Sequence, residues 1–390
     1  MGEAYIVAAT RTAGGRKGGK LKDWHPVDLA AQVLNNLMDR TNADPALIED
    51  VVMGCVGQAG EQAVNVARNA VLASRLPESV PGTSVDRQCG SSQQAMHFAA
   101  QAVMSGTQDV VIAAGVESMT RVPMGTPSIL AAKAGLGNYM SPNMQERYPN
   151  IQFSQFMGAE MVAEKYGLTK DEIDQYSYES HQRAIAATQA GAFKKEIVEV
   201  EITDADGNKS THTVDEGIRF DASLDAIKGV KLLREGGRLT AASSSQICDG
   251  ASGVMICNEK GLKALGVEPI ARIHHLTLIG HDPVIMLEAP IPASQLALKR
   301  AGMSVDDIDA FEVNEAFGSV PVAFMKTLGV DRDKINVHGG AIALGHPLGA
   351  SGTKLMSTLL GVLEARGGKW GLQTMCEGGG LANVTIVERL

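Results

Sequence analysis

Apolar and polar positions along the chain follow two alternating patterns. In residues 27–40 the apolar side chains Leu29, Val33 and Leu37 recur every four positions, which is the spacing of an amphipathic helix. Residues 109–115 (DVVIAAG) are instead an almost continuous apolar run, typical of a strand covered on both faces. The same two patterns predict strands at 3–10, 50–56, 253–258, 270–279 and 372–376, and helices at 65–74, 91–105, 155–167 and 169–191. Strands alternating with helices indicate an α/β fold.

The two ends of the chain repeat one pattern: a helical turn, an isoleucine, an acid and an apolar strand. The isoleucines of the two copies are Ile48 and Ile308, an offset of 260 residues (308 − 48). Ser91 and Ser351 share this offset, and each opens a long predicted helix, while the strands after those helices fit only with a drift of about two residues. We therefore predict a duplicated α/β half. The carboxyl ends of its central strands should meet at one interface, where ligands of open α/β sheets bind.

The middle of the chain has a different character. Residues 119–150 are rich in Gly, Pro, Ser and Met without periodicity, which predicts an excursion over the surface or the lining of an apolar tunnel. Residues 194–213 alternate like a surface hairpin whose turn is Asp206–Gly207. Basic residues concentrate in residues 219–238, the best local candidate for a polyanionic ligand site; an ordinary solvated surface is the alternative.

Composition narrows the class of protein. A length of 390 residues allows two domains, and 43 glycines with 4% aromatic residues suit tight βα turns. The net charge of −9 argues against a general nucleic-acid binder. Five scattered cysteines, without zinc spacing, argue against a disulfide framework and a metal site. With no signal peptide and no membrane-spanning apolar run in the sequence, we expect a cytoplasmic protein, or a matrix protein in a eukaryote, without membrane contact.

One glycine-rich stretch has the spacing of a nucleotide-binding loop. Gly14, Gly19 and Lys20 fit the phosphate-binding pattern, but Leu21 stands where a Ser or Thr should hold magnesium. We therefore favour a simple glycine-rich turn over a nucleotide site.

Cys89 is the first candidate for chemistry. It directly precedes the predicted helix at 91–105, with Ser91 and Ser92 as capping residues. Unpaired amides and the helix dipole at such a position should lower the pKa of the thiol and populate the nucleophilic thiolate. A buried structural thiol is the alternative for a lone cysteine.

Three further residues should reach the interface between the halves. Asn314 follows a second-half strand, His346 lies between Gly345 and Pro347 before a helix, and Cys376 ends the last inner strand. A histidine can accept the Cys89 proton, an asparagine can donate to an oxyanion, and a second thiol of near-neutral pKa suits proton transfer at a carbon beside a thioester.

The remaining cysteines have simpler interpretations. Cys55, Cys248 and Cys257 lie in or beside apolar strands and are expected in the core. A redox pair formed by Cys89 and Cys376 would lack the usual CxxC spacing.

Five segments resemble the motifs of the thiolase family, and the resemblance covers the whole chain. They are residues 86–95 (DRQCGSSQQA), 115–119 (GVESM), 314–317 (NEAF), 339–352 (GGAIALGHPLGASG) and 376–380 (CEGGG). The resemblance implies a duplicated, five-layered αβαβα fold with an inserted loop domain. The expected parts are 1–118 plus 246–268 for the N-terminal half, 119–245 for the coenzyme A-binding loop domain and 269–390 for the C-terminal half.

The resemblance also implies roles. Cys89 would be the acylated nucleophile, His346 its activator and an oxyanion donor, and Cys376 the acid/base. Asn314 would hold a water of one oxyanion site, and the amides of Cys89 and Gly378 would form the other.

Coenzyme A would be a substrate rather than a tightly bound cofactor, and a homotetramer built from dimers is expected. Residues that match coenzyme A-contacting positions are Ser245, Arg219, Met157 and Phe317.

Two departures bear on the substrate. Phe156 stands where many short-chain biosynthetic thiolases have His, and His338 where many members carry Asn. The Cys89 motif resembles degradative thiolases, including some that act on bulky acyl chains. We therefore predict thiolytic cleavage of 3-ketoacyl-CoA, with biosynthetic acetoacetyl-CoA formation as the alternative.

Two other functions stay open as alternatives. A ketoacyl-synthase-type condensing enzyme should have a second histidine where Cys376 stands. A non-catalytic lipid-binding or complex-forming subunit would not need the Cys, His and Cys set.

Overall fold

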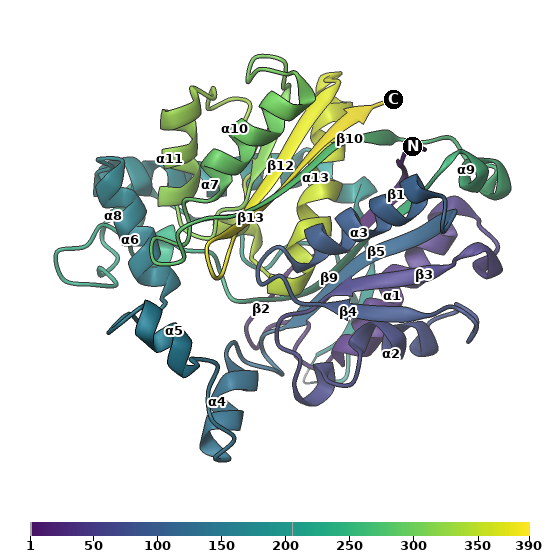
Figure 1. The fold of residues 1–390 in the computed structure, drawn as a ribbon, viewed down its shortest axis with the longest axis horizontal. Coiled ribbons are helices and arrows are strands. Elements are labelled where there is room, and N and C mark those ends of the chain that lie inside the picture. The colour runs from purple at the N-terminus through teal and green to yellow at the C-terminus, as the bar shows by residue number, and fades with distance from the viewer. Residues whose placement is uncertain (1, 205) are drawn as a thin grey trace.

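The computed structural model describes residues 2–204 and 206–390 and consists of two similar α/β halves (Figure 1). Strands of the first half are β1 (Tyr5–Thr12), β3 (Asp50–Gly54), β4 (Gly82–Val85), β5 (Val110–Ser118) and β9 (Cys248–Cys257), with short strands β2 (Gly15–Arg16) and β6 (Ile197–Val198). Strands of the second half are β10 (Ala271–Gly280), β11 (Ala310–Val313), β12 (Trp370–Glu377) and β13 (Leu381–Arg389). The strands predicted from apolar runs are all present, with ends shifted by a few residues.

Strand order confirms the duplication. The first half has the order β4-β3-β5-β9-β1, and the second has β11-β12-β13-β10, with a bridge from Ile335 to Phe311 where the first half has β4. Parallel and antiparallel neighbours also correspond between the halves. The expected drift of two residues is wrong, because β5 starts at Val110 and β12 at Trp370, which keeps the offset at 260 (370 − 110). The halves join edge to edge, where Tyr5 and Ile6 of β1 pair with β10.

Helices form three layers around the two half-sheets. The first-half helices are α1 (Pro26–Thr41), α2 (Val66–Ala73), α3 (Ser91–Ser105) and α9 (Glu259–Leu265); the second-half helices are α10 (Pro290–Ala301), α11 (Ser319–Leu328), α12 (Ala341–Leu344) and α13 (Ser351–Arg366). One core lies beneath α1 and α2, a second beneath α10 and α11, and a third contains α3 and α13 between the half-sheets (Figure 1). The order of layers is therefore αβαβα, as the family resemblance implied.

The central layer brings the two equivalent helix N-termini together. Helix α3 begins at Ser91 and α13 at Ser351, and the amide of Thr353 donates to Oγ of Ser92 at 3.1 Å. A Cβ on Gly352 would lie 2.1 Å from the amide nitrogen of Gln93, so only glycine permits this approach. The repeat thus places the residues before both helices at one interface.

The segment between β5 and β9 carries the helices α4 (Thr126–Lys133), α5 (Pro142–Arg147), α6 (Gln155–Lys165), α7 (Lys170–Gln189) and α8 (Leu224–Lys228). Helices α4 and α5 project from the body of the molecule, which agrees with the predicted excursion (Figure 1). The predicted hairpin is shorter than expected, with strands β7 (Val200–Thr203) and β8 (Lys209–His212); residue 205 in its loop lies outside the described residues. Among the described residues, no helix has the length and apolar character to cross a membrane.

Candidate active site

Cys89 lies on a tight turn directly before α3. The turn places Gln88 at a positive φ of 49°, and the N-terminal cap of the helix is Gly90, which has no side chain to accept from the first amides. The prediction that Ser91 and Ser92 cap the helix is wrong, since both are already helical. The Ser91 hydroxyl instead donates to the carbonyl of Gln88 at 2.6 Å and braces the turn.

The turn that bears Cys89 packs on the loop that follows Cys376. A Cβ added to Gly90 would lie 2.0 Å from Oε1 of Glu377, and a Cβ on Gly378 would lie 3.0 Å from Oε1 of Gln88. Residues 287 positions apart (376 − 89) are thereby brought to the same place. Cys376 is fully buried and Cys89 is 8% exposed, so both thiols lie inside the molecule and Cys89 is the more accessible of the two.

Burial controls both thiols. It raises the pKa of Cys89 to about 12, aided by the charge of Glu377, although hydrogen bonds from the amides of Cys89 and Gly378 lower it. Burial and the charge of Cys89 raise the pKa of Cys376 well above its usual value. The expected lowered pKa of Cys89 and the near-neutral pKa of Cys376 are therefore wrong, because loss of water outweighs the amides at the helix N-terminus. A thiol with so high a pKa can act as a nucleophile only if a base takes its proton.

His346, the base expected from the sequence, has a well-defined set of partners. Its amide donates to the carbonyl of Gln246 at 3.0 Å, its Nδ1 lies 2.5 Å from Oγ of Ser351, and its Nε2 lies 3.4 Å from Nδ2 of Asn314. The ring is 3% exposed, and burial followed by the charge of Lys354 lowers its pKa to about 3. The imidazole is therefore neutral at physiological pH and able to accept a proton.

Hydrogen bonding selects the tautomer of His346. The hydroxyl of Ser351 has a single proton, which it donates to the carbonyl of Pro347 at 2.9 Å. With that proton engaged, Nδ1 carries the ring proton and donates to Ser351. The lone pair of Nε2 then faces the amide group of Asn314.

Glu117, in the motif at 115–119, has a role that the sequence analysis missed. Its Oε1 accepts from the Gly57 amide and Nε2 of Gln62, both at 2.9 Å, and its Oε2 accepts from the Val56 amide at 2.9 Å and the Gly349 amide at 2.8 Å. Four donors surround one buried carboxylate. Glu117 therefore ties the end of β3 to the loop that follows His346.

Glu377 is the equivalent residue of the second half, at the offset of 260 (377 − 117). The amide of Asn383 donates to its Oε1 at 3.1 Å, whereas its buried Oε2 has no partner among the described residues. Burial raises the pKa of Glu377 to about 8. The repeat could have identified both glutamates, since it relates their positions directly.

Glu315, beside Asn314, is a second missed residue. Its carboxylate accepts from Tyr176 at 2.8 Å and Ser180 at 2.7 Å on α7, and from Asn336 and the Ile342 amide, both at 3.1 Å. It joins three segments of the site, and its position within the motif at 314–317 was the available signal.

The residues expected to contact coenzyme A differ in their exposure to solvent. Arg219 is exposed and lines a cavity of about 400 Å³, and Met157 is 41% exposed. The Ser245 amide donates to the carbonyl of Ala316 at 2.9 Å, which places Ser245 next to Phe317. Phe317 is only 2% exposed, and its ring packs edge-on against Phe156 at a centroid distance of 5.5 Å.

The two remaining expectations concern the other cysteines and the glycine-rich stretch. Cys55, Cys248 and Cys257 are buried free thiols, as predicted. Residues 14–21 form a turn around the short strand β2, which agrees with the predicted glycine-rich turn.

Family models match almost the entire chain. Residues 4–260 match the model described as "Thiolase, N-terminal domain", and residues 267–389 match "Thiolase, C-terminal domain".

Proteins similar to this chain in sequence or in structure agree with the family models. The chain is 51% identical to steroid 3-ketoacyl-CoA thiolase FadA6 of Mycobacterium tuberculosis, over 100% of this chain and 95% of that protein. It is 40% identical to 3-ketoacyl-CoA thiolase of Salmonella typhimurium, over 100% of both. Human mitochondrial 3-ketoacyl-CoA thiolase superposes with a TM-score of 0.90 at 34% identity, over 100% of this chain and 99% of that one. Bacillus anthracis acetyl-CoA acetyltransferase superposes with a TM-score of 0.91 at 33% identity, with the same coverage. The chain belongs to the thiolase family.

Proposed function

We propose that this thiolase cleaves 3-ketoacyl-CoA with Cys89 as nucleophile, His346 as its base and Cys376 as the acid/base. The observation that carries the proposal is the contact between the Cys89 turn and the loop after Cys376, with the amides of Cys89 and Gly378 directed at one sulfur. Two amides so directed can stabilise negative charge on a thioester oxygen during acyl transfer.

The reaction follows from these positions. His346 takes the proton of Cys89, whose sulfur attacks the 3-keto carbon of the substrate. The bond between C2 and C3 breaks, its electron pair forms the enolate of acetyl-CoA, and the thiol of Cys376 protonates C2. The thiol of a second coenzyme A then gives its proton to the Cys376 thiolate and attacks the acyl-Cys89 thioester, which releases acyl-CoA, and protonated His346 returns its proton to the sulfur of Cys89. Nε2 of His346 and a water held by Asn314 would stabilise the oxyanion of the 3-keto group.

The structure also favours a bulky, apolar acyl group. Phe156 is 46% exposed and packs on Phe317, so an aromatic pair occupies the position where many biosynthetic thiolases carry a polar His. The relative named for steroid 3-ketoacyl-CoA is 51% identical over the whole chain. We therefore propose acyl-CoA with a steroid-derived or similarly bulky acyl group as the substrate class.

Paired cysteine variants test the assignment. Cys89→Ala should abolish both the acyl-enzyme and turnover, whereas Cys376→Ala should still form acyl-Cys89 from acyl-CoA yet fail to break the carbon–carbon bond. Intact-protein mass spectrometry detects the acyl group, and loss of the magnesium–enolate absorbance of 3-ketoacyl-CoA follows thiolysis. Equal loss of acylation in both variants would contradict the division of roles.

A substrate panel tests the acyl group. The panel runs from acetoacetyl-CoA to steroid side-chain 3-ketoacyl-CoA, and the ratio of kcat/KM values is the readout. Preference for acetoacetyl-CoA would favour the biosynthetic alternative.

We also propose that residues 119–245 act as the coenzyme A-binding domain of a cytoplasmic homotetramer, with Ser245, Arg219 and Met157 near the cofactor-like substrate. The projecting segment exposes apolar side chains that suit a contact between subunits: Ile129 is 51%, Leu130 56% and Leu136 80% exposed. Light scattering on the purified protein measures the assembly, and a monomer would contradict it.

A further inference from the structure

A buried lysine holds the turn that carries His346. Lys354 lies in the second turn of α13 and is 3% exposed. Its Nζ donates to the carbonyl of Leu344 at 2.6 Å and to that of Gly345 at 3.0 Å. These two carbonyls directly precede His346 in the chain. The lysine therefore holds the backbone conformation from which the imidazole projects.

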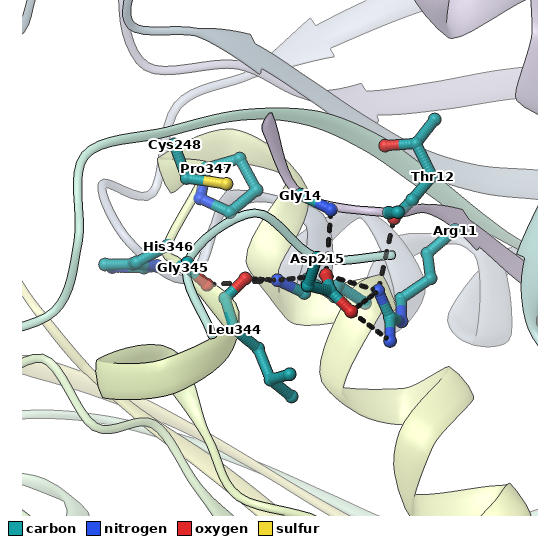
Figure 2. A network of polar contacts seen from close by, with 12 residues as sticks. Arg11, Thr12, Gly14, Asp215, Cys248, Leu344, Gly345, His346 and Pro347 are labelled. Atoms are coloured by element: carbon teal, nitrogen blue, oxygen red, sulfur yellow. Dashed lines mark hydrogen bonds and ion pairs between the residues drawn. The ribbon is translucent and has the colours of Figure 1, made fainter. Parts of the chain in front are cut away.

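The charge of this lysine is balanced from the inserted segment. Oδ1 of Asp215 lies 3.9 Å from Nζ of Lys354, and Asp215 also accepts from Nη1 of Arg11 and from the Gly14 amide, both at 2.8 Å (Figure 2). Arg11 in turn donates to Glu196 at 2.6 Å. Two cations and two carboxylates are buried together.

Stability alone does not account for this arrangement. Burying charges costs desolvation free energy, and well-packed apolar side chains of similar volume are often as stable. The donors of Lys354, however, are directed at two backbone carbonyls beside a reacting group, which an apolar side chain cannot reproduce.

A second tether reaches the same turn from the same segment. Nε2 of Gln246 donates to the carbonyls of Gly217 at 2.8 Å and Ile342 at 2.7 Å, while the Gln246 carbonyl accepts the amide of His346 at 3.0 Å. Residues 215–217 are thus connected to the His346 turn on both sides.

We propose that Lys354, anchored by Asp215, is a positioning residue of the thiolase reaction, which sets the His346 turn so that Nε2 faces the reacting carbonyl. This inference rests on the proposed role of His346. In this proposal, residues 215–217 connect the coenzyme A-binding segment to the imidazole of His346.

The charge of Lys354 also affects the pKa of the His346 ring. Burial lowers the pKa of His346 most, and the positive charge of Lys354 lowers it further, to about 3. The two side chains that contact the ring nitrogens, Ser351 and Asn314, are uncharged, and Cys248 against Gly345 stays a thiol because burial raises its pKa to about 12. A substitution that removes the charge of Lys354 should therefore raise the pKa of His346.

Lys354→Gln tests the proposal, because glutamine keeps one donor but loses the charge. The single-turnover rate of Cys89 acylation should fall on the order of 10- to 100-fold, since a displaced reacting group loses much of its effect. The acid limb of the pH profile of acylation should move to higher pH. Lys354→Arg retains charge and donors and should restore most of the rate. Lys195→Gln is the control, because the Lys195 side chain is 80% exposed and its one ion pair among the described residues is with Glu364; its rate and profile should match wild type.

Asp215→Asn is an independent second variant, which removes the anchor and leaves Lys354 in place. It should also lower the acylation rate, with the acid limb unmoved or at lower pH. Wild-type acylation rates and pH profiles in both Lys354→Gln and Asp215→Asn would overturn the proposal, and so would lower thermal stability of Lys354→Gln with an unmoved pH profile. His346→Ala separates the two levels: wild-type acylation in that variant would refute the proposed function itself, whereas an inactive His346→Ala beside a normal Lys354→Gln would refute only the positioning role.

Discussion

Replacing Glu117 by glutamine should destabilise the protein strongly although the two side chains have the same shape. Oε1 accepts from the Gly57 amide and Gln62, and Oε2 from the amides of Val56 and Gly349, at 2.8 to 2.9 Å. A carboxamide retains one of these oxygens and turns an NH₂ group toward the two donors of the other. Each buried donor left without an acceptor costs about 1–3 kcal/mol, so the loss should be roughly 2–6 kcal/mol. That is a large part of the roughly 5–15 kcal/mol by which folded domains are stable.

Urea unfolding followed by circular dichroism at pH 7 measures the effect, at equal protein concentration for all variants because assembly contributes to stability. Glu312→Gln is the matched control, since Glu312 is also a buried glutamate but its Oε2 has no partner among the described residues. A loss of less than about 1 kcal/mol in Glu117→Gln, the size of an ordinary substitution, would refute the reasoning.

Three further outcomes are expected. Burial raises the pKa of Glu312 well above its usual value, so the wild type should lose stability as pH rises from the unfolded pKa of about 4.3. In thermal melts, the stability of Glu312→Gln relative to the wild type should therefore increase from pH 4 to pH 8. A difference between the two proteins that does not change with pH would contradict this. The charge of Glu377, whose pKa is about 8, raises the pKa of Cys89. Above pH 8, iodoacetamide should therefore alkylate Cys89 faster in Glu377→Gln than in the wild type. Identical pH profiles of alkylation would exclude the effect. Ser351→Ala removes the partner of Nδ1 of His346 and should slow single-turnover acylation about 10-fold or more, so an unchanged rate would argue against a role in fixing the tautomer.

Much of the fold was predictable because its signals are local. The capping box formed by Thr169 and Glu172, and the end of α3 at Gly106 in the left-handed conformation, depend on residues a few positions apart. The equal offset of Ser91 and Ser351 made the duplication visible, and the duplication predicted that both helix N-termini meet. The duplication was also the reason why Cys89, His346 and Cys376 could be selected as candidate site residues.

The tertiary structure alone decided the chemical state of these residues. From the sequence, the N-terminus of α3 suggested a lowered pKa for Cys89, yet burial raises it to about 12, because desolvation depends on everything that packs around the sulfur. The sequence also contains no sign that Lys354 lies 3.9 Å from Asp215, 139 positions away (354 − 215), since such a pairing arises only when the inserted segment folds against the second half. Local patterns therefore determined which elements form, whereas long-range burial determined how the site ionises and which side chains hold it.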